Sequence, residues 1–408
     1  MQRTADPDAL GFDPARLARI DTHFARYVDD GRLAGWQIVV TRRGETVHAS
    51  THGMRDREAG LPVEPDTLWR IYSMTKPLTS VAAMQLWEQG RFELNDEVSR
   101  YIPAFADVRV YDRGSSKLPW TVPAAEPVRI WHLLTHTAGL TYGFMHTHVA
   151  DAVYRAGGYE WGVPPGTDLA TACDAWAGMP LLFQPGSRWG YSVATDVLGR
   201  LVEVLSGQPL DAYLAEHVTG PLGMVDTCFW VEPERADRLA ALYSPSPADG
   251  TAVRLDAFGA AALTAPTFLS GGGGLVSTAA DYSRFTQLLL GGGEAGGTRL
   301  LGSRTLAFMV QNHLPGGLDL GALSTGGFAE TTFDGVGFGL GFATVLDPRP
   351  AKTLASPGEF FWGGAASTAF WVDPAEEITA LLMTQLLPSS THPLRPQLRQ
   401  LVYSALVD

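Results

Sequence analysis

The chain has 408 residues, of which 45% are hydrophobic and 18% charged, and its formal net charge is −13. This much apolar material supports a large packed core, while the acidic balance is unsuited to binding nucleic acid or an anionic membrane. No apolar stretch approaches the roughly 18 residues that cross a bilayer. The first residues contain no basic segment leading into an apolar region, so we expect no secretory signal.

The sequence contains only two cysteines, Cys173 and Cys228. Two cysteines cannot build a disulfide framework or a usual zinc site. We expect buried free thiols, because free cysteine is among the most buried residue types. This expectation agrees best with a reducing compartment, and we predict a cytoplasmic protein.

The N-terminal segment predicts a helix followed by a β-hairpin. Asp13 and Pro14 suit the N-cap and the first helical position, the following apolar residues have helical spacing, and Gly31 comes after the predicted end. Residues 37–41 and 46–50 predict two strands joined around Arg43-Gly44.

The C-terminal part also predicts strands, at residues 337–346, 368–372 and 378–384. A final helix is expected from about residue 395 to 406, with Pro396 in its first turn.

The middle of the chain, in contrast, has mostly helical apolar spacing interrupted by Pro/Gly loops. Strand-rich ends around a helical middle predict the α+β class. We expect residues 1–75 and 245–408 to form an α/β domain built from both termini. Residues 76–244 would form a mostly helical inserted domain, with an active site between the two.

The strongest candidate for chemistry is the tetrapeptide Ser73-Met74-Thr75-Lys76. If Ser73 opens a helix that continues to about Gln89, Lys76 lies one turn further on the same face and the two side chains can meet. A nearby desolvated amine can accept the serine proton, so Ser73 is a candidate nucleophile and Lys76 its base. The pattern also suits an N-cap serine followed by a solvated lysine.

Two other segments can complete such a site. Tyr191 precedes a predicted helix, where its phenol would either relay a proton or pack at a domain boundary. The paired glycines of Trp362-Gly363-Gly364 would let a substrate lie against a strand edge, or would mark a bulge in an edge strand. A backbone N–H just beyond them and that of Ser73 can form an oxyanion hole.

These three elements, in this order, resemble the serine β-lactamase and penicillin-binding-protein superfamily. The closer resemblance is to the class C β-lactamase-like carboxylesterases, known as family VIII esterases. It extends from about Phe12 to Gln385, and further similar stretches are residues 131–140, 221–224 and 271–282. The family fold implied is a β-lactamase-like antiparallel sheet flanked by helices plus a mostly helical domain.

The resemblance assigns roles to individual residues. Ser73 matches the acylated nucleophile, Lys76 its base and Tyr191 the tyrosine that shares proton transfer. Ala365 would supply the second oxyanion N–H beside that of Ser73. The expected substrate-binding residues are Trp362, Gly363, Gly364, Val193 and Tyr142.

Two departures from the lactamase pattern affect the expected substrate. Val193 stands where lactamases have Asn, and Trp362 stands where they have the Lys of Lys-Thr-Gly. Losing an amide and a charge removes contacts worth about 1.5–3 kcal/mol each, so neutral esters are favoured over penicillins.

Other interpretations of the motifs remain. Ser192 approximates the nucleophile of Gly-x-Ser-x-Gly, but the expected helical context does not suit an α/β-hydrolase elbow. A third metal ligand cannot be placed beside the histidines, so we expect no metal site. The remaining aromatic residues of this region suit either a core or a pocket wall. The histidines and aromatic residues concerned are His132, His136, His146 and His148, and Tyr142, Phe144, Tyr154, Tyr159 and Trp161.

We therefore predict a serine carboxylesterase that hydrolyses short-chain or neutral esters through an acyl-enzyme on Ser73, with little β-lactamase activity. No cofactor is expected, the expected partner is a small-molecule ester rather than nucleic acid or a membrane, and the oligomeric state stays open. The alternatives are an acyltransferase on the same acyl-enzyme, a β-lactamase or DD-peptidase, and a non-catalytic binding protein of the same fold.

Overall fold

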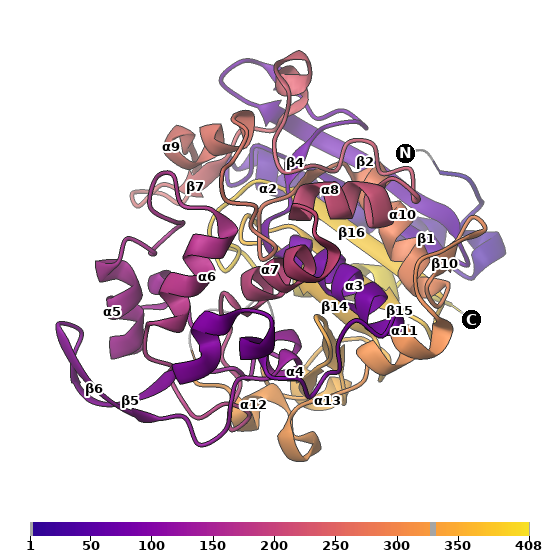
Figure 1. The fold of residues 1–408 in the computed structure, drawn as a ribbon. Coiled ribbons are helices and arrows are strands. Elements are labelled where there is room, and N and C mark those ends of the chain that lie inside the picture. The colour runs from indigo at the N-terminus through magenta and orange to yellow at the C-terminus, as the bar shows by residue number, and fades with distance from the viewer. Residues whose placement is uncertain (1–2, 327–331, 408) are drawn as a thin grey trace.

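Strands from the two ends of the chain pair side by side in one sheet (Figure 1). The computed structural model describes residues 3–326 and 332–407, and in these residues the main sheet has eight strands in the order β12-β13-β14-β15-β16-β1-β2-β3. All neighbouring pairs are antiparallel. The strands are β1 (Gly35–Arg42), β2 (Glu45–Asp56), β3 (Leu61–Pro62), β12 (Val336–Phe338), β13 (Ala343–Val345), β14 (Phe360–Gly363), β15 (Ala369–Asp373) and β16 (Ile378–Thr384).

The sheet is covered on both faces, which explains why β1 is buried along its whole length. The indole of Trp36 donates to the carbonyl of Phe24 in α2 (Arg19–Asp29). The amide of Gln287, in α10 (Ala279–Leu290), donates to the hydroxyl of Thr41. Successive side chains point to opposite faces of a strand, so α2 and α10 lie on opposite faces of the sheet.

The middle of the chain forms most of the other helices, which lie on one side of the sheet in Figure 1. The central one is α3 (Thr75–Glu88), in which every side chain from Thr75 to Leu86 is buried. A helix that is buried on all sides belongs in the core. The other helices of this region are α4 (Ile130–Leu134), α5 (Val149–Ala156), α6 (Leu169–Ala177), α7 (Ala194–Ser206) and α8 (Leu210–Leu214).

The smaller elements connect these layers. The two-stranded pairs are β4 (Trp69–Arg70) with β9 (Val276–Ser277), β5 (Arg109–Ser115) with β6 (Leu118–Pro123), β7 (Tyr243–Pro245) with β8 (Ala252–Arg254), and β10 (Glu294–Ala295) with β11 (Thr298–Arg299). The remaining α-helices are α1 (Pro14–Leu17), α9 (Asp256–Gly259), α11 (Ser303–Met309), α12 (Leu320–Leu323), α13 (Pro348–Ala351) and α14 (Leu394–Tyr403).

Several expected elements differ in detail from the structure. The single strand predicted at 337–346 is wrong, because the chain reverses there and forms the antiparallel pair β12 and β13. Gly341 lies in this reversal with φ +98°, a conformation that favours glycine. The first predicted helix is two helices, α1 and α2, although Asp13 caps it as expected. The final helix ends at Tyr403, and Pro396 lies in its first turn.

A closed polar cluster joins α14 to the sheet. The carboxylates of Glu359 and Asp373 are fully buried, and the hydroxyl of Tyr403 lies 2.5 Å from one and 2.6 Å from the other. Arg399 contacts Glu359 at 2.6 Å and lies over the ring of Trp371. Burial raises the pKa of Glu359 to about 7, which the Arg399 charge opposes. We call these four residues, Glu359, Asp373, Arg399 and Tyr403, the α14 cluster.

Among the residues described here, no helix is long and apolar enough to cross a membrane. Cys173 is buried and Cys228 half-buried, and both are free thiols. The domain boundaries at 75/76 and 244/245 stay a prediction. The first of them lies at the start of α3.

Candidate active site

Ser73 lies at the junction between a short strand and the buried helix. β4 pairs with β9. A 3₁₀ turn, Tyr72–Met74, then carries Ser73, and α3 begins at the next residue. Tyr72 has φ +43°, in the left-handed region that few non-glycine residues occupy. Ser73 therefore precedes the helix that was expected to start with it, and its side chain reaches a cavity.

Lys76 occupies the first turn of α3, and only 1% of it is exposed. Its Nζ lies 3.3 Å from the Oγ of Ser73, as the spacing predicts. The ammonium also donates to the hydroxyl of Tyr142 at 3.0 Å and to the carbonyl of Gly272 at 2.6 Å. A buried amine held by three oxygens is oriented, and one of those oxygens belongs to the candidate nucleophile.

Tyr191 lies beside this amine, just before α7. The Nζ of Lys76 is 4.6 Å from the centre of the Tyr191 ring. The indole N–H of Trp362 donates to the Tyr191 hydroxyl oxygen at 3.3 Å. A donor at the phenol oxygen stabilises a phenolate more than a neutral phenol, so this contact suits a tyrosine that gives up and recovers a proton.

The position of Trp362 differs from the predicted substrate contact. Only 1% of Trp362 is exposed, and in the described part of the chain it is not one of the residues that line the cavity. The alternation along β14 explains this, because Phe361 faces Arg399 of α14 while Trp362 faces Tyr191. Trp362 therefore contacts Tyr191 rather than the cavity. Gly363 and Gly364 also lie outside the lining.

Ala365 follows these glycines and lines the cavity together with Ser73. A side chain at Gly364 would collide with the carbonyl of Ile71, two residues before Ser73. The absence of a Cβ thus allows the segment after β14 to lie against the turn that carries Ser73. This proximity suits the two backbone N–H donors of an oxyanion hole.

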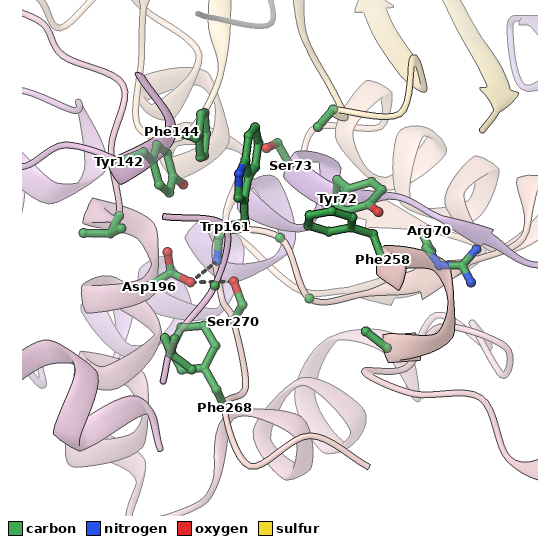
Figure 2. A pocket seen from close by; sticks show the side chains of 18 of the residues that line it. Arg70, Tyr72, Ser73, Tyr142, Phe144, Trp161, Asp196, Phe258, Phe268 and Ser270 are labelled. Carbon is green, nitrogen blue, oxygen red and sulfur yellow. Dashed lines mark hydrogen bonds between the residues drawn. The ribbon is translucent and has the colours of Figure 1, made fainter. Parts of the chain in front are cut away.

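A fully buried carboxylate organises the opposite side of Lys76. Asp196, in the first turn of α7, accepts from the hydroxyl of Ser270 at 2.6 Å and from the backbone N–H of Gly272 at 3.0 Å (Figure 2). Burial raises its pKa, and the Lys76 charge opposes that rise. Asp196 therefore fixes the same loop whose carbonyl at Gly272 holds Lys76.

A cavity of about 600 Å³ opens from Ser73 and is lined mainly by aromatic and aliphatic side chains. The rings of Tyr142 and Phe144 stack with centres 4.8 Å apart, and those of Phe144 and Trp161 stack at 5.1 Å. The edge of Phe258, in α9, meets Trp161 at 6.1 Å. Figure 2 shows the four rings, which we call the aromatic ladder (Tyr142, Phe144, Trp161 and Phe258). Tyr142 contacts Lys76 and Trp161 is 59% exposed, so the aromatic ladder extends from Lys76 to solvent.

The structure thus brings together Ser73, Lys76, Tyr191 and Tyr142, and places Val193 and Ala365 in the cavity wall. Tyr159 also lines the cavity, whereas Tyr154 is fully buried and does not. The contact of Tyr142 with Lys76 and the role of Asp196 were not predicted. The sequence offered no local signal for Asp196, because its partner Gly272 is 76 residues away in the chain.

Neither Ser192 nor His136 is among the residues that line the cavity, although the His136 ring packs against Tyr191 with ring centres 5.1 Å apart. Ser192 is buried, and its hydroxyl bonds to Nδ1 of His136 at 3.2 Å. Burial lowers the pKa of His136 well below its usual value, and the charge of Lys76 adds to this effect, so the ring is neutral. Throughout residues 3–326 and 332–407, no group of three or more His, Cys, Asp or Glu side chains is placed to hold a metal.

Comparisons with known proteins show the family to which the chain belongs. The family model described as Beta-lactamase matches residues 20–404. The chain is 35% identical to Esterase EstB of Burkholderia gladioli, with 98% of each chain covered. It is 28% identical to a lovastatin esterase of Penicillium rubens, covering 87% of this chain and 89% of the relative. The solved structure of EstCE1, a hydrolase with promiscuous acyltransferase activity, superposes with a TM-score of 0.79 at 29% identity, covering 97% and 99%.

Proposed function

The chain belongs to the beta-lactamase family and is a carboxylesterase, and from this premise we propose that it hydrolyses neutral hydrophobic esters through an acyl-enzyme on Ser73. The observation that carries the proposal is the 3.3 Å contact between Lys76 Nζ and Ser73 Oγ at the inner end of an apolar cavity. A buried amine in contact with a serine hydroxyl is the arrangement that activates this nucleophile.

In the proposed reaction, Ser73 Oγ attacks the ester carbonyl carbon and its proton passes to the Lys76–Tyr191 pair. The N–H groups of Ser73 and Ala365 bind the resulting oxyanion. The tetrahedral intermediate then breaks its bond to the alkoxy oxygen, which leaves as the alcohol with that proton. Water attacks the acyl-enzyme with the same pair as base, and the acid is released.

The cavity supports a substrate with one large apolar substituent and no charge on the part that enters. Val193 gives the wall an apolar surface where a lactamase-like site would offer an amide. The aromatic ladder adds flat faces on which rings or fused hydrocarbon groups stack. Little β-lactamase activity is proposed for the same reason.

Acyl transfer is the second candidate, and the likeness to EstCE1 favours it. An acyl-enzyme partitions between water and any alcohol that occupies the leaving-group position. Apolar walls around Ser73 exclude water and hold an apolar alcohol well, so transfer needs no additional residue.

The test is to treat the protein with a p-nitrophenyl alkylphosphonate and map the adduct by mass spectrometry. We expect one adduct on the peptide containing Ser73, complete loss of esterase activity, and no adduct in Ser73→Ala. Ser192→Ala is the matched control and retains labelling. Labelling of Ser73→Ala at the wild-type rate would contradict the proposed nucleophile.

We also propose a cytoplasmic location. The two free thiols, Cys173 and Cys228, support it, since they persist in a reducing compartment.

A further inference from the structure

Arg395 of α14 lies on the far side of the glycines that lead to Ala365. Its Nη2 donates to the carbonyl of Gly364 at 2.8 Å and to the carbonyl of Thr368 at 2.8 Å. A Cβ added at Gly363 would collide with the guanidinium carbon, so the planar group lies directly on the backbone of β14. The backbone N–H of Ser367 also donates to the Gly364 carbonyl, at 3.0 Å.

The Gly364 carbonyl and the Ala365 N–H belong to the same peptide unit. This unit is planar and trans, so its carbonyl and its N–H point in opposite directions. Two donors hold the carbonyl on the α14 side, and the N–H is thereby directed to the other side. Ala365 lines the cavity on that other side, where Ser73 also lies.

We propose that Arg395 is a positioning residue that orients and polarises the Gly364–Ala365 peptide, so that its N–H is a strong donor to the oxyanion. This inference rests on the proposed acyl-enzyme function. An oxyanion hole is effective because its donors are aligned before the charge develops. A cation at the carbonyl end draws electron density from the peptide and strengthens the N–H donor at the opposite end.

This position explains the glycine at 363. Phe361 and Gly363 face α14, whereas Trp362 faces Tyr191. Any larger side chain at 363 would displace the guanidinium. Trp362 on one face of β14 thus donates to Tyr191. Gly363 on the other face leaves space for Arg395 of α14, which holds the Gly364–Ala365 peptide.

The test compares Arg395→Met, which keeps the length and loses the donors, with Arg395→Gln, which keeps one neutral donor. For p-nitrophenyl butyrate we expect kcat to fall by roughly 10- to 100-fold in Arg395→Met, with KM within about twofold, because losing one oxyanion donor outright costs 10²–10³. The inhibition constant of an alkylboronic acid, which forms a tetrahedral adduct on serine, should rise by the same factor. Arg395→Gln should lie between this variant and the wild type.

Arg399→Met is the matched control, because it removes a second arginine of α14 that pairs with the buried Glu359 instead. It should lower the melting temperature without changing the ratio of boronate affinity to KM. An unchanged boronate affinity in either folded Arg395 variant would overturn the inference, as would an equal loss in Arg399→Met. Wild-type protein that the phosphonate does not label at Ser73 would instead show that the proposed function is wrong.

Discussion

Two buried groups of side chains in this molecule each combine a phenol, a carboxylate and a cation, but in different arrangements. At the inner end of the cavity, the phenol of Tyr191 lies beside the cation Lys76, and the carboxylate Asp196 holds the adjacent loop. In the α14 cluster, the phenol of Tyr403 lies between the carboxylates of Glu359 and Asp373, beside the cation Arg399. Only the first of these groups borders a cavity.

The comparison shows that a buried, strongly perturbed group is not by itself a site. Tyr403 has a single proton and two carboxylates within hydrogen-bond distance, so the second contact requires a proton on a carboxyl group. Burial raises the pKa of Glu359, and the charge of the neighbouring Asp373 adds to that rise. Lys76 is buried as well, but its amine contacts Ser73, which lines the cavity, and this contact is what distinguishes it from the α14 cluster.

The largest effect on activity is expected at Lys76 and Tyr191. Lys76→Ala and Tyr191→Phe should each lower kcat by about 10²–10⁴-fold, because both serve one proton transfer. The double variant should be little worse than the poorer single variant, since groups that act as a unit have non-additive losses. The measurement is kcat/KM on p-nitrophenyl butyrate for the wild type, the two single variants and the double variant. Independent, multiplicative losses would contradict a shared task.

The second effect concerns the free energy of unfolding and is expected in the α14 cluster. The folded-state pKa of Glu359 is raised, so the native protein binds a proton that the unfolded chain has released between pH 4.5 and about 7. The free energy of unfolding should therefore fall as pH rises through this window, by up to about 1.4 kcal/mol per pH unit. Glu359→Gln should remove this fall, while its kcat stays near that of the wild type.

Urea unfolding at several pH values between 4 and 8 measures this difference. Glu126→Gln, a change at an exposed carboxylate, is the control and should follow the wild-type curve. A constant difference between Glu359→Gln and the wild type across the window would show that Glu359 does not titrate there.

The smallest effect is expected at the outer end of the aromatic ladder. Trp161→Ala should raise KM for a naphthyl ester about 3- to 10-fold, because a stacked aromatic pair is worth roughly 0.5–1.5 kcal/mol. KM for ethyl acetate should change less than twofold, since this ester carries no ring that could stack on Trp161. Trp120→Ala, an exposed tryptophan on β6, is the control. Equal changes in KM for both esters would show that the aromatic ladder does not contribute to the preference for large aromatic esters.

The contacts that sequence reasoning could predict are the local ones. Ser73 and Lys76 are three residues apart, and helical geometry alone brings them together. The contacts it could not predict join distant segments, as where Gly272 meets Lys76 and Gly364 meets Arg395. The direction of Trp362 also escaped prediction, because the register of β14 against β15 decides which face a strand residue occupies.

The pairing of β1 with β16 has a consequence for the making of the protein. Val39 is opposite Leu381, so the partner of this central strand is synthesised more than 300 residues after it. At roughly 5–20 residues per second, β1 and β2 leave the ribosome tens of seconds before β16 exists. A two-stranded hairpin is at best marginally stable, and an unpaired apolar edge invites aggregation. β1 therefore stays without its second partner until the chain has been synthesised as far as β16, and its apolar edge depends on other contacts until then.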